Sequence, residues 1–241
     1  MNKSSLKNTV LVTGASRGIG LSIAKLFAQS GYIVYANYRG KKAELDELCA
    51  KAGGASIIPV RADVCDAAEI EAMLKKTGGV DILVNNAGSS KARQFIDIDE
   101  ADWEDMLRSN LTSAFLCTKA AIGPMLRQKW GRIINISSVW GVTGGSCEVH
   151  YSAAKAGLIG FTKALAKEMG PSGILVNCIA PGAIDTRMND ELTKEDRLWV
   201  QEHTPLGTFG LPGDVAGAAL FLARSSFITG EVLNVNGGFH I

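Results

Sequence analysis

The feature that most constrains the fold is a glycine-rich turn near the N-terminus. The strand-like run Asn-Thr-Val-Leu-Val-Thr at 8–13 is followed at once by Gly14, Gly18 and Gly20, in the spacing G-x-x-x-G-x-G. Beyond the glycines, apolar residues recur at helical spacing over 19–27. Such a turn between a strand and a helix lets the backbone approach a pyrophosphate at the helix N-terminus. The pattern predicts a nucleotide-binding strand–turn–helix unit, although glycines that serve only the turn give the same spacing.

Short apolar runs alternate with amphipathic segments along the rest of the chain. We expect strands at 8–13, 32–37, 56–60, 80–84, 131–137, 174–180 and 231–236, and helices at 18–30, 41–52, 66–77, 100–128, 151–170 and 213–224. This alternation predicts an α/β fold, a Rossmann-type doubly wound parallel sheet covered on both faces. Because no linker interrupts the 241 residues, we expect a single domain over 1–241. The polar stretch 181–212, with a short helix near 194–202, is expected to be a substrate lid.

A tyrosine and a lysine four residues apart, Tyr151 and Lys155, share one face of the helix expected at 151–170. Ser138 lies thirteen residues before Tyr151, at the end of an expected strand. At about 4 Å and an effective dielectric near 20, a cation stabilises a neighbouring anion by roughly 4 kcal/mol. Lys155 is therefore expected to lower the pKa of the Tyr151 phenol by about three units, toward neutrality. A surface pair without a chemical role has the same spacing, and Ser137 could replace Ser138.

Composition excludes several classes of protein. With 25 Lys and Arg against 24 Asp and Glu, the net charge of +1 offers no electrostatic footprint for nucleic acid. The apolar runs have strand length, well short of the ~20 residues of a membrane span, and no signal-peptide core is apparent. The five cysteines show no C-x-x-C pair, and the three histidines lie too far apart to suggest a metal site. We expect a cytoplasmic enzyme without a metal and with no nucleic acid or membrane partner.

The ordered motifs resemble the short-chain dehydrogenase/reductase family almost end to end. They are Thr13-Gly-x-x-x-Gly-x-Gly20, Asp63, Asn85-Asn86-Ala87-Gly88, Asn110, Ser138, Tyr151-x-x-x-Lys155, Pro181-Gly182 and Val235-Asn-Gly-Gly238. Within the family, the stretches 131–138, 155–161 and 228–231 are most similar to bacterial 3-oxoacyl-[acyl-carrier-protein] reductases of fatty acid biosynthesis.

The resemblance implies a role for each catalytic residue. Tyr151 is the general acid when a ketone is reduced, and Lys155 lowers its pKa and binds the nicotinamide ribose. Ser138 polarises the substrate carbonyl. Asn110 bends its helix and holds a water in a proton relay to Lys155.

The resemblance also implies a cofactor site. The pyrophosphate and its ribose are assigned to Gly14, Ser16, Gly18 and Ile19, with Gly20 allowing close helix packing. Asp63 and Val64 are assigned to the adenine, and Asn86, Ala87 and Gly88 to the adenine ribose. The nicotinamide face is assigned to Pro181, Gly182, Ile184 and Thr186, together with Tyr151 and Lys155.

The cofactor is expected to be NADPH. Enzymes that use NAD usually place an acid at the end of the second strand to bind the ribose 2′-hydroxyl. Here the sequence is Tyr35-Ala-Asn37-Tyr38-Arg39, which has no acid and ends in an arginine suited to a phosphate. Arg17 in the glycine turn adds a second cation. Arg39 could instead be a solvated loop charge.

The substrate is expected to be a 3-oxoacyl thioester, and an acyl carrier protein is a candidate partner. The carrier-protein reductases present two cations at the active-site rim, and this chain keeps one, Lys129, but has Ser172 at the second position. Glu148 also places a carboxylate where those enzymes tend to have a neutral residue. Both differences weaken the inference to a carrier.

Other activities remain open at this stage. The chain could instead be a hydroxysteroid dehydrogenase, a small-alcohol dehydrogenase or a reductase of a ketone attached to a protein, and it could also be an inactive dinucleotide-binding protein. Apolar residues around more than one face of the helices at 100–128 and 151–170 favour a homotetramer, as in the family.

Overall fold

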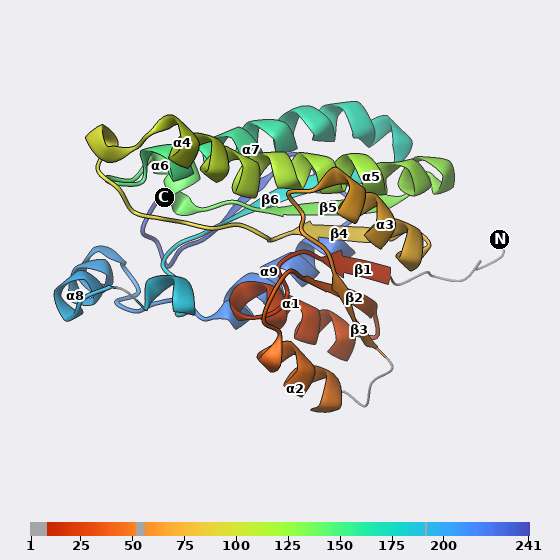
Figure 1. Cartoon of the computed structure of the whole chain (residues 1–241), viewed down its shortest axis with the longest axis horizontal. Coiled ribbons are helices and arrows are strands. Elements are labelled where there is room, and N and C mark those ends of the chain that lie inside the picture. The colour runs from red at the N-terminus through yellow and green to blue at the C-terminus, as the bar shows by residue number, and fades with distance from the viewer. Residues whose placement is uncertain (1–8, 52–55, 191) are drawn as a thin grey trace.

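The computed structural model describes residues 9–51, 56–190 and 192–241 and contains one parallel seven-stranded sheet (Figure 1). The strand order is β3-β2-β1-β4-β5-β6-β7. The strands are β1 Thr9–Val12, β2 Ile33–Tyr38, β3 Ile57–Arg61, β4 Ile82–Asn85, β5 Gly131–Ile136, β6 Ile174–Pro181 and β7 Val232–Val235. Every neighbouring pair is parallel, so all carboxyl ends lie at one edge. The predicted doubly wound α/β fold is confirmed.

The strands of this sheet are apolar on both faces, and helices cover both faces. On one face lie α1 Gly18–Gln29, α2 Ala43–Lys51 and α9 Pro212–Arg224, and on the other α3 Ala67–Thr77, α4 Glu100–Leu107, α5 Ser113–Gln128 and α7 Val149–Met169 (Figure 1). Alternation along β1 sets the two cores: Val10 and Val12 pack into one, and Leu11 into the other.

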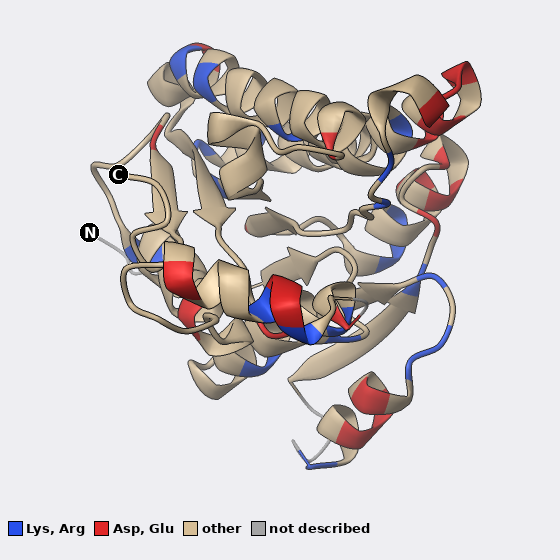
Figure 2. Ribbon diagram, turned by 90° about the vertical axis from the view of Figure 1, so that its left-hand side faces the viewer, with Lys and Arg blue, Asp and Glu red and all other residues tan. Residues whose placement is uncertain are grey.

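The chain reverses its winding between β1 and β4, which are neighbours at the centre of the sheet. In open α/β sheets a ligand binds beyond the carboxyl ends of the strands at such a switch point. The short helices α6 Val139–Thr143 and α8 Lys194–His203 and the C-terminus lie at this end (Figure 1). Charges of both signs are mixed over the elements around it (Figure 2).

The predicted elements agree with the observed ones, apart from short 3-10 turns and two larger differences. The expected helix 100–128 is interrupted by a π-helical turn, Arg108–Thr112, between α4 and α5. Helix α6 was not predicted, because five residues that include a glycine give no helical period. The predicted ends at positions 8 and 52 lie outside the described residues. Helix α8 confirms the helix expected near 194–202, whereas the lid role of 181–212 stays a prediction.

Candidate active site

Four elements bring the predicted catalytic residues to the carboxyl end of the sheet. Ser138 follows β5 and caps α6, where its Oγ accepts a hydrogen bond from the Trp140 backbone N–H at 3.2 Å. Tyr151 and Lys155 lie one turn apart in α7, and both side chains are buried. The hydroxyl of Ser137, in contrast, donates to the Lys155 backbone carbonyl at 2.9 Å. The Ser138 hydroxyl instead hydrogen-bonds to the Tyr151 hydroxyl, so Ser138 is the serine that belongs to the candidate site.

The ammonium group of Lys155 lies near the tyrosine without bonding to its oxygen. Its Nζ is 5.6 Å from the centroid of the Tyr151 ring and donates to the Ile136 carbonyl at 2.9 Å. That carbonyl ends β5, so the strand that positions Ser138 also holds the lysine. Nζ also lies next to Gly88, where an added Cβ would be 3.4 Å from it.

Burial dominates the ionisation of this pair. It raises the pKa of the Tyr151 hydroxyl to about 12, while a hydrogen bond from Ser138 acts in the opposite direction. Burial also lowers the pKa of Lys155 to about 8. The prediction that Lys155 brings the phenol toward neutrality is therefore wrong for this structure. The cation is directed at the Ile136 carbonyl, so the loss of hydration outweighs its attraction to a phenolate.

Asn110 lies in the π-helical turn between α4 and α5, and its side chain is buried. Its Nδ2 donates to the carbonyls of Ser89 at 2.9 Å and Met106 at 3.1 Å. The Oδ1 atom has no partner among the described residues, although it is buried. An added Cβ at Gly88 would lie only 2.4 Å from this oxygen. Gly88 thus allows the amide of Asn110 and the ammonium group of Lys155 to approach the same stretch of backbone.

The glycine turn is shaped by close backbone contacts. Gly14 has a φ of +64°, and an added Cβ would lie 2.9 Å from the Cα of Ala87. At Gly20 an added Cβ would lie 2.5 Å from the Nδ2 of Asn86, which donates to the Thr13 carbonyl at 2.8 Å. The first and third glycines therefore let the turn pack against the end of β4.

The N-terminus of α1 is open to an anion. The N-cap residue Arg17 makes no side-chain capping bond, and the first turn of α1 contains no acid. The first backbone N–H groups of this helix accordingly have no side-chain acceptor among the described residues. Ser16 and Ile19 flank this end and are half-buried. Gly18 has a φ of +57°, and an added Cβ would meet Thr186 at 3.5 Å, so the loop after β6 reaches the same place.

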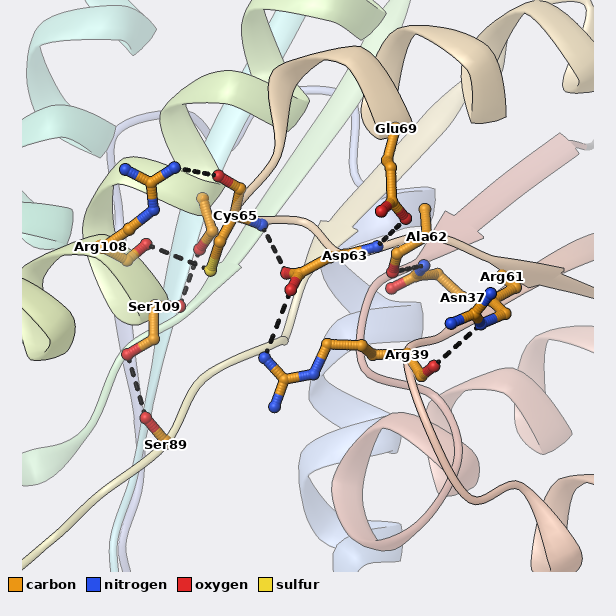
Figure 3. A network of polar contacts seen from close by, with 11 residues as sticks. Asn37, Arg39, Arg61, Ala62, Asp63, Cys65, Glu69, Ser89, Arg108 and Ser109 are labelled. Carbon is orange, nitrogen blue, oxygen red and sulfur yellow. Dashed lines mark hydrogen bonds and ion pairs between the residues drawn. The ribbon is translucent and has the colours of Figure 1, made fainter.

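The end of β2 presents a cation but no acid. The Nη1 of Arg39 lies 3.4 Å from Oδ2 of Asp63, and the Arg39 side chain is 74 % exposed (Figure 3). The backbone N–H of Cys65 and the charge of Arg39 hold the pKa of Asp63 below its usual value. Asn37 is buried, accepts a hydrogen bond from the Gly14 backbone N–H at 3.2 Å and donates to the Ala62 carbonyl at 3.0 Å. The neutral residue at this strand end thus fixes the glycine turn.

The other predicted cofactor residues surround the same end of the sheet. Val64 is buried after β3, and the Ala87 N–H donates to the Thr13 hydroxyl at 3.0 Å. After β6, the N–H of Gly182 donates to the Val235 carbonyl at 3.0 Å, and Ile184 is buried. Pro181 ends β6 itself, ahead of these two residues.

A family model described as enoyl-(acyl carrier protein) reductase matches residues 14–240. The chain belongs to the short-chain dehydrogenase/reductase family. This family consists of oxidoreductases that act on CH–OH and C=O groups with a nicotinamide dinucleotide.

Relatives within the family extend over nearly the whole chain. A 3-oxoacyl-[acyl-carrier-protein] reductase from Aquifex aeolicus is 44% identical over 236 residues, 95% of each chain. A (2S)-[(R)-hydroxy(phenyl)methyl]succinyl-CoA dehydrogenase subunit from Thauera aromatica is 43% identical over 238 residues, 95% of this chain and 94% of the relative. The crystal structure of an Agrobacterium tumefaciens protein assigned as a gluconate dehydrogenase superposes with a TM-score of 0.91 at 34% identity, covering 96% of this chain and 95% of that one.

The two positions compared with the carrier-protein reductases of the family do not lie at the rim of this chain's own site. Lys129 follows α5 and precedes β5, and Ser172 precedes β6. Both therefore lie at the amino ends of their strands, whereas Ser138 and Tyr151 lie at the carboxyl end (Figure 1). The expectation that these two positions lie at the active-site rim is therefore wrong for a single chain. Residues just before parallel strands lie at one edge of the sheet, and residues just after them, such as Ser138, lie at the other.

The sequence analysis did not find one part of the candidate active site. The segment 89–93 is joined to the residues just before Tyr151: the Ser90 hydroxyl donates to both Glu148 oxygens at 2.9 and 3.0 Å, and the Arg93 N–H donates to the Cys147 carbonyl at 2.8 Å. Burial raises the pKa of Glu148. The unusual carboxylate was visible in the sequence, but its partner lies 58 residues away.

Proposed function

We propose that this protein is an NADPH-dependent reductase that converts a ketone, in particular a 3-oxoacyl thioester, to a secondary alcohol. The observation that carries the proposal is the convergence of Ser138, Tyr151, Lys155 and Asn110 beside the glycine turn, at the switch point of the sheet. In this geometry a hydroxyl donor, a proton donor and a buried cation lie together where the fold binds ligands.

The residues around the glycine turn fit a nicotinamide dinucleotide. The open N-terminus of α1 suits a pyrophosphate, since its free N–H groups and its helix dipole favour negative charge. Gly14 and Gly18 have positive φ values that other residues rarely adopt, and they let the backbone approach closely. When bound, the cofactor supplies the hydride that attacks the carbonyl carbon.

The chain's own residues supply the proton that the developing alkoxide takes up. Tyr151, with a pKa of about 12, is protonated at neutral pH, so it can donate a proton to the developing alkoxide. Ser138 donates a hydrogen bond to the same oxygen and stabilises its developing charge, while it keeps its own proton. Because the phenol carries its proton at neutral pH, Tyr151 is in the state that the reductive direction requires. Lys155, held by Ile136, supplies the positive charge that offsets the phenolate once the proton has left.

A preference for NADPH over NADH is supported by the end of β2. The exposed Arg39 can turn from Asp63 to a 2′-phosphate, and Arg17 at the α1 N-cap lies exposed in the glycine turn. The neutral Asn37 offers no carboxylate that would repel a phosphate.

A thioester substrate is supported by the names of the relatives, which act on acyl carrier protein or CoA derivatives. We favour small thioesters over an obligatory carrier, because Lys129 lies at the far end of this chain's sheet and Ser172 is uncharged. CoA and carrier thioesters should therefore be reduced with kcat/KM values within about tenfold of each other, or about 1.4 kcal/mol.

We further propose a homotetramer. Phe115 on α5 is 43% exposed and Phe221 on α9 is 55% exposed, so two separate helix faces present large apolar side chains that a neighbouring copy would cover.

Of the helices in the described residues, none is long and apolar enough to cross a membrane.

The test is NADPH oxidation with acetoacetyl-CoA. The wild type should turn over, and Tyr151→Phe, which removes only the proton donor, should lower kcat by roughly 10² or more while cofactor binding survives. Tyr32→Phe, at the amino end of β2, is the matched control and should keep wild-type activity. A Tyr151→Phe variant with more than a tenth of wild-type turnover would show that another group supplies the proton. No turnover with any ketone would favour an inactive dinucleotide-binding protein.

A further inference from the structure

Three aromatic side chains from distant parts of the chain meet at the carboxyl end of the sheet. Trp140 lies on α6, Trp199 on α8 and Phe239 near the C-terminus. The ring of Phe239 lies 5.4 Å from that of Trp140 at 85° and 6.4 Å from that of Trp199 at 64°, both edge-to-face. The elements that carry them surround the same end of the molecule (Figure 1). We call Trp140, Trp199 and Phe239 the aromatic wall.

The backbone holds Phe239 in place through two glycines. Gly237 and Gly238 have φ values of +64° and +87°, and added Cβ atoms would lie 2.7 Å from Thr204 and 3.0 Å from Pro205. The Leu206 N–H also donates to the Gly237 carbonyl at 3.1 Å. The C-terminal segment is thus joined to the end of α8, and this junction places Phe239 between the two tryptophans.

The wall begins at the reacting centre. The backbone N–H of Trp140 donates to the Oγ of Ser138, the residue assigned to the substrate carbonyl. The Trp140 indole also packs closely on Gly145, where an added Cβ would lie 2.9 Å from Cδ2. The residue that bears this indole is thus bonded to the serine assigned to the carbonyl, and the indole lies beside the segment that leads into α7.

The other end of the wall is open to solvent. Trp199 is 48% exposed, and the segment 181–212 carries four more large exposed apolar residues: Met188 at 56%, Leu198 at 55%, Leu206 at 74% and Leu211 at 60%. Apolar residues gathered on a segment beside a reacting centre indicate a ligand surface. Since this surface continues from Ser138, its occupant is the apolar part of the substrate.

We propose that the aromatic wall binds an aryl group attached to the ketone, and that the preferred substrates are aryl-substituted 3-oxoacyl thioesters. This inference rests on the proposed ketone reduction. A linear acyl chain gains only buried area against such a wall, whereas a flat ring also gains the electrostatic preference of aromatic pairs for offset or edge-to-face packing. Trp140 is the specificity-determining residue, because it lies nearest to the carbonyl.

The experiment compares benzoylacetyl-CoA with 3-cyclohexyl-3-oxopropanoyl-CoA, which has a similar size and apolar character without a flat ring. Acetoacetyl-CoA reports the basal reaction. The wild type should reduce the phenyl substrate with a kcat/KM about three- to tenfold above that of the cyclohexyl substrate. Trp140→Leu should bring this ratio to about one, and Trp140→Phe should retain it. Phe227→Leu, a fully exposed aromatic elsewhere, is the control and should leave the ratio unchanged.

Equal kcat/KM values for the two rings in the wild type, or a Trp140→Leu variant that lowers both equally, would overturn the aryl assignment while leaving ketone reduction intact. If acetoacetyl-CoA and both ring substrates all remain unreduced, the proposed function fails and the aryl assignment fails with it.

Discussion

Replacing Lys155 by methionine should make the protein more stable at neutral pH. The Lys155 side chain is buried, and its Nζ donates a hydrogen bond to the Ile136 carbonyl. Burial lowers its pKa from 10.5 to about 8. At about 1.36 kcal/mol for each pKa unit, the buried cation costs about 3 kcal/mol of unfolding free energy at pH 7. Methionine has a similar length and no charge to bury.

Part of this gain in unfolding free energy is lost. Removing Nζ leaves the Ile136 carbonyl without its donor, at a cost of about 1 kcal/mol. We therefore expect Lys155→Met to gain about 2 kcal/mol and, for a chain of this length, roughly 4–8 °C in Tm. Lys163→Met, on an exposed position of the same helix, is the matched control and should change little.

The pH dependence separates charge burial from packing. A base whose pKa is lower in the folded chain binds fewer protons than the unfolded chain between pH 8 and 10.5. Wild-type stability from this group therefore rises through that window, and the advantage of Lys155→Met shrinks as the penalty disappears. Urea unfolding of the wild type and both variants at pH 7 and pH 10 measures this. A variant that is less stable than the wild type at pH 7, or a difference that stays the same at both pH values, would refute the reasoning.

Three further outcomes are expected. Arg39→Ala should lower kcat/KM for NADPH about tenfold and leave NADH unchanged, because the lost contact is with the 2′-phosphate; equal effects on both cofactors would contradict it, and Arg127→Ala is the control. Light scattering should give a mass near four times the 25.5 kDa of the chain, and a stable monomer would exclude the tetramer. Ser172→Arg should leave acetoacetyl-CoA reduction unchanged, and a wild-type carrier thioester rate far more than tenfold above the CoA rate would disprove the preference for small thioesters.

The sequence predicted most of the fold because local signals and topology agree. Apolar runs and glycine turns mark the strands and most of the long helices, and a parallel sheet then brings all strand ends to one edge. Gly14, Ser138 and Tyr151 could be placed there on that argument. The direction of the Tyr151 pKa shift could not, because it depends on how far the phenol is buried and where Lys155 points. The Ser90–Glu148 contact joins distant segments that share no periodic pattern.

The π-helical turn at Arg108–Thr112 can be understood as a one-residue surplus in a helix that otherwise runs from Glu100 to Gln128. Such a bulge is the outcome of inserting one residue into a regular helix without disturbing the packing on either side. Shortening the turn by one residue would restore regular helical bonding, yet it would withdraw the Asn110 amide from the neighbourhood of Gly88. The position of the candidate site residue Asn110 thus depends on the length of this helix, and a relative that is one residue shorter here should lack the same arrangement.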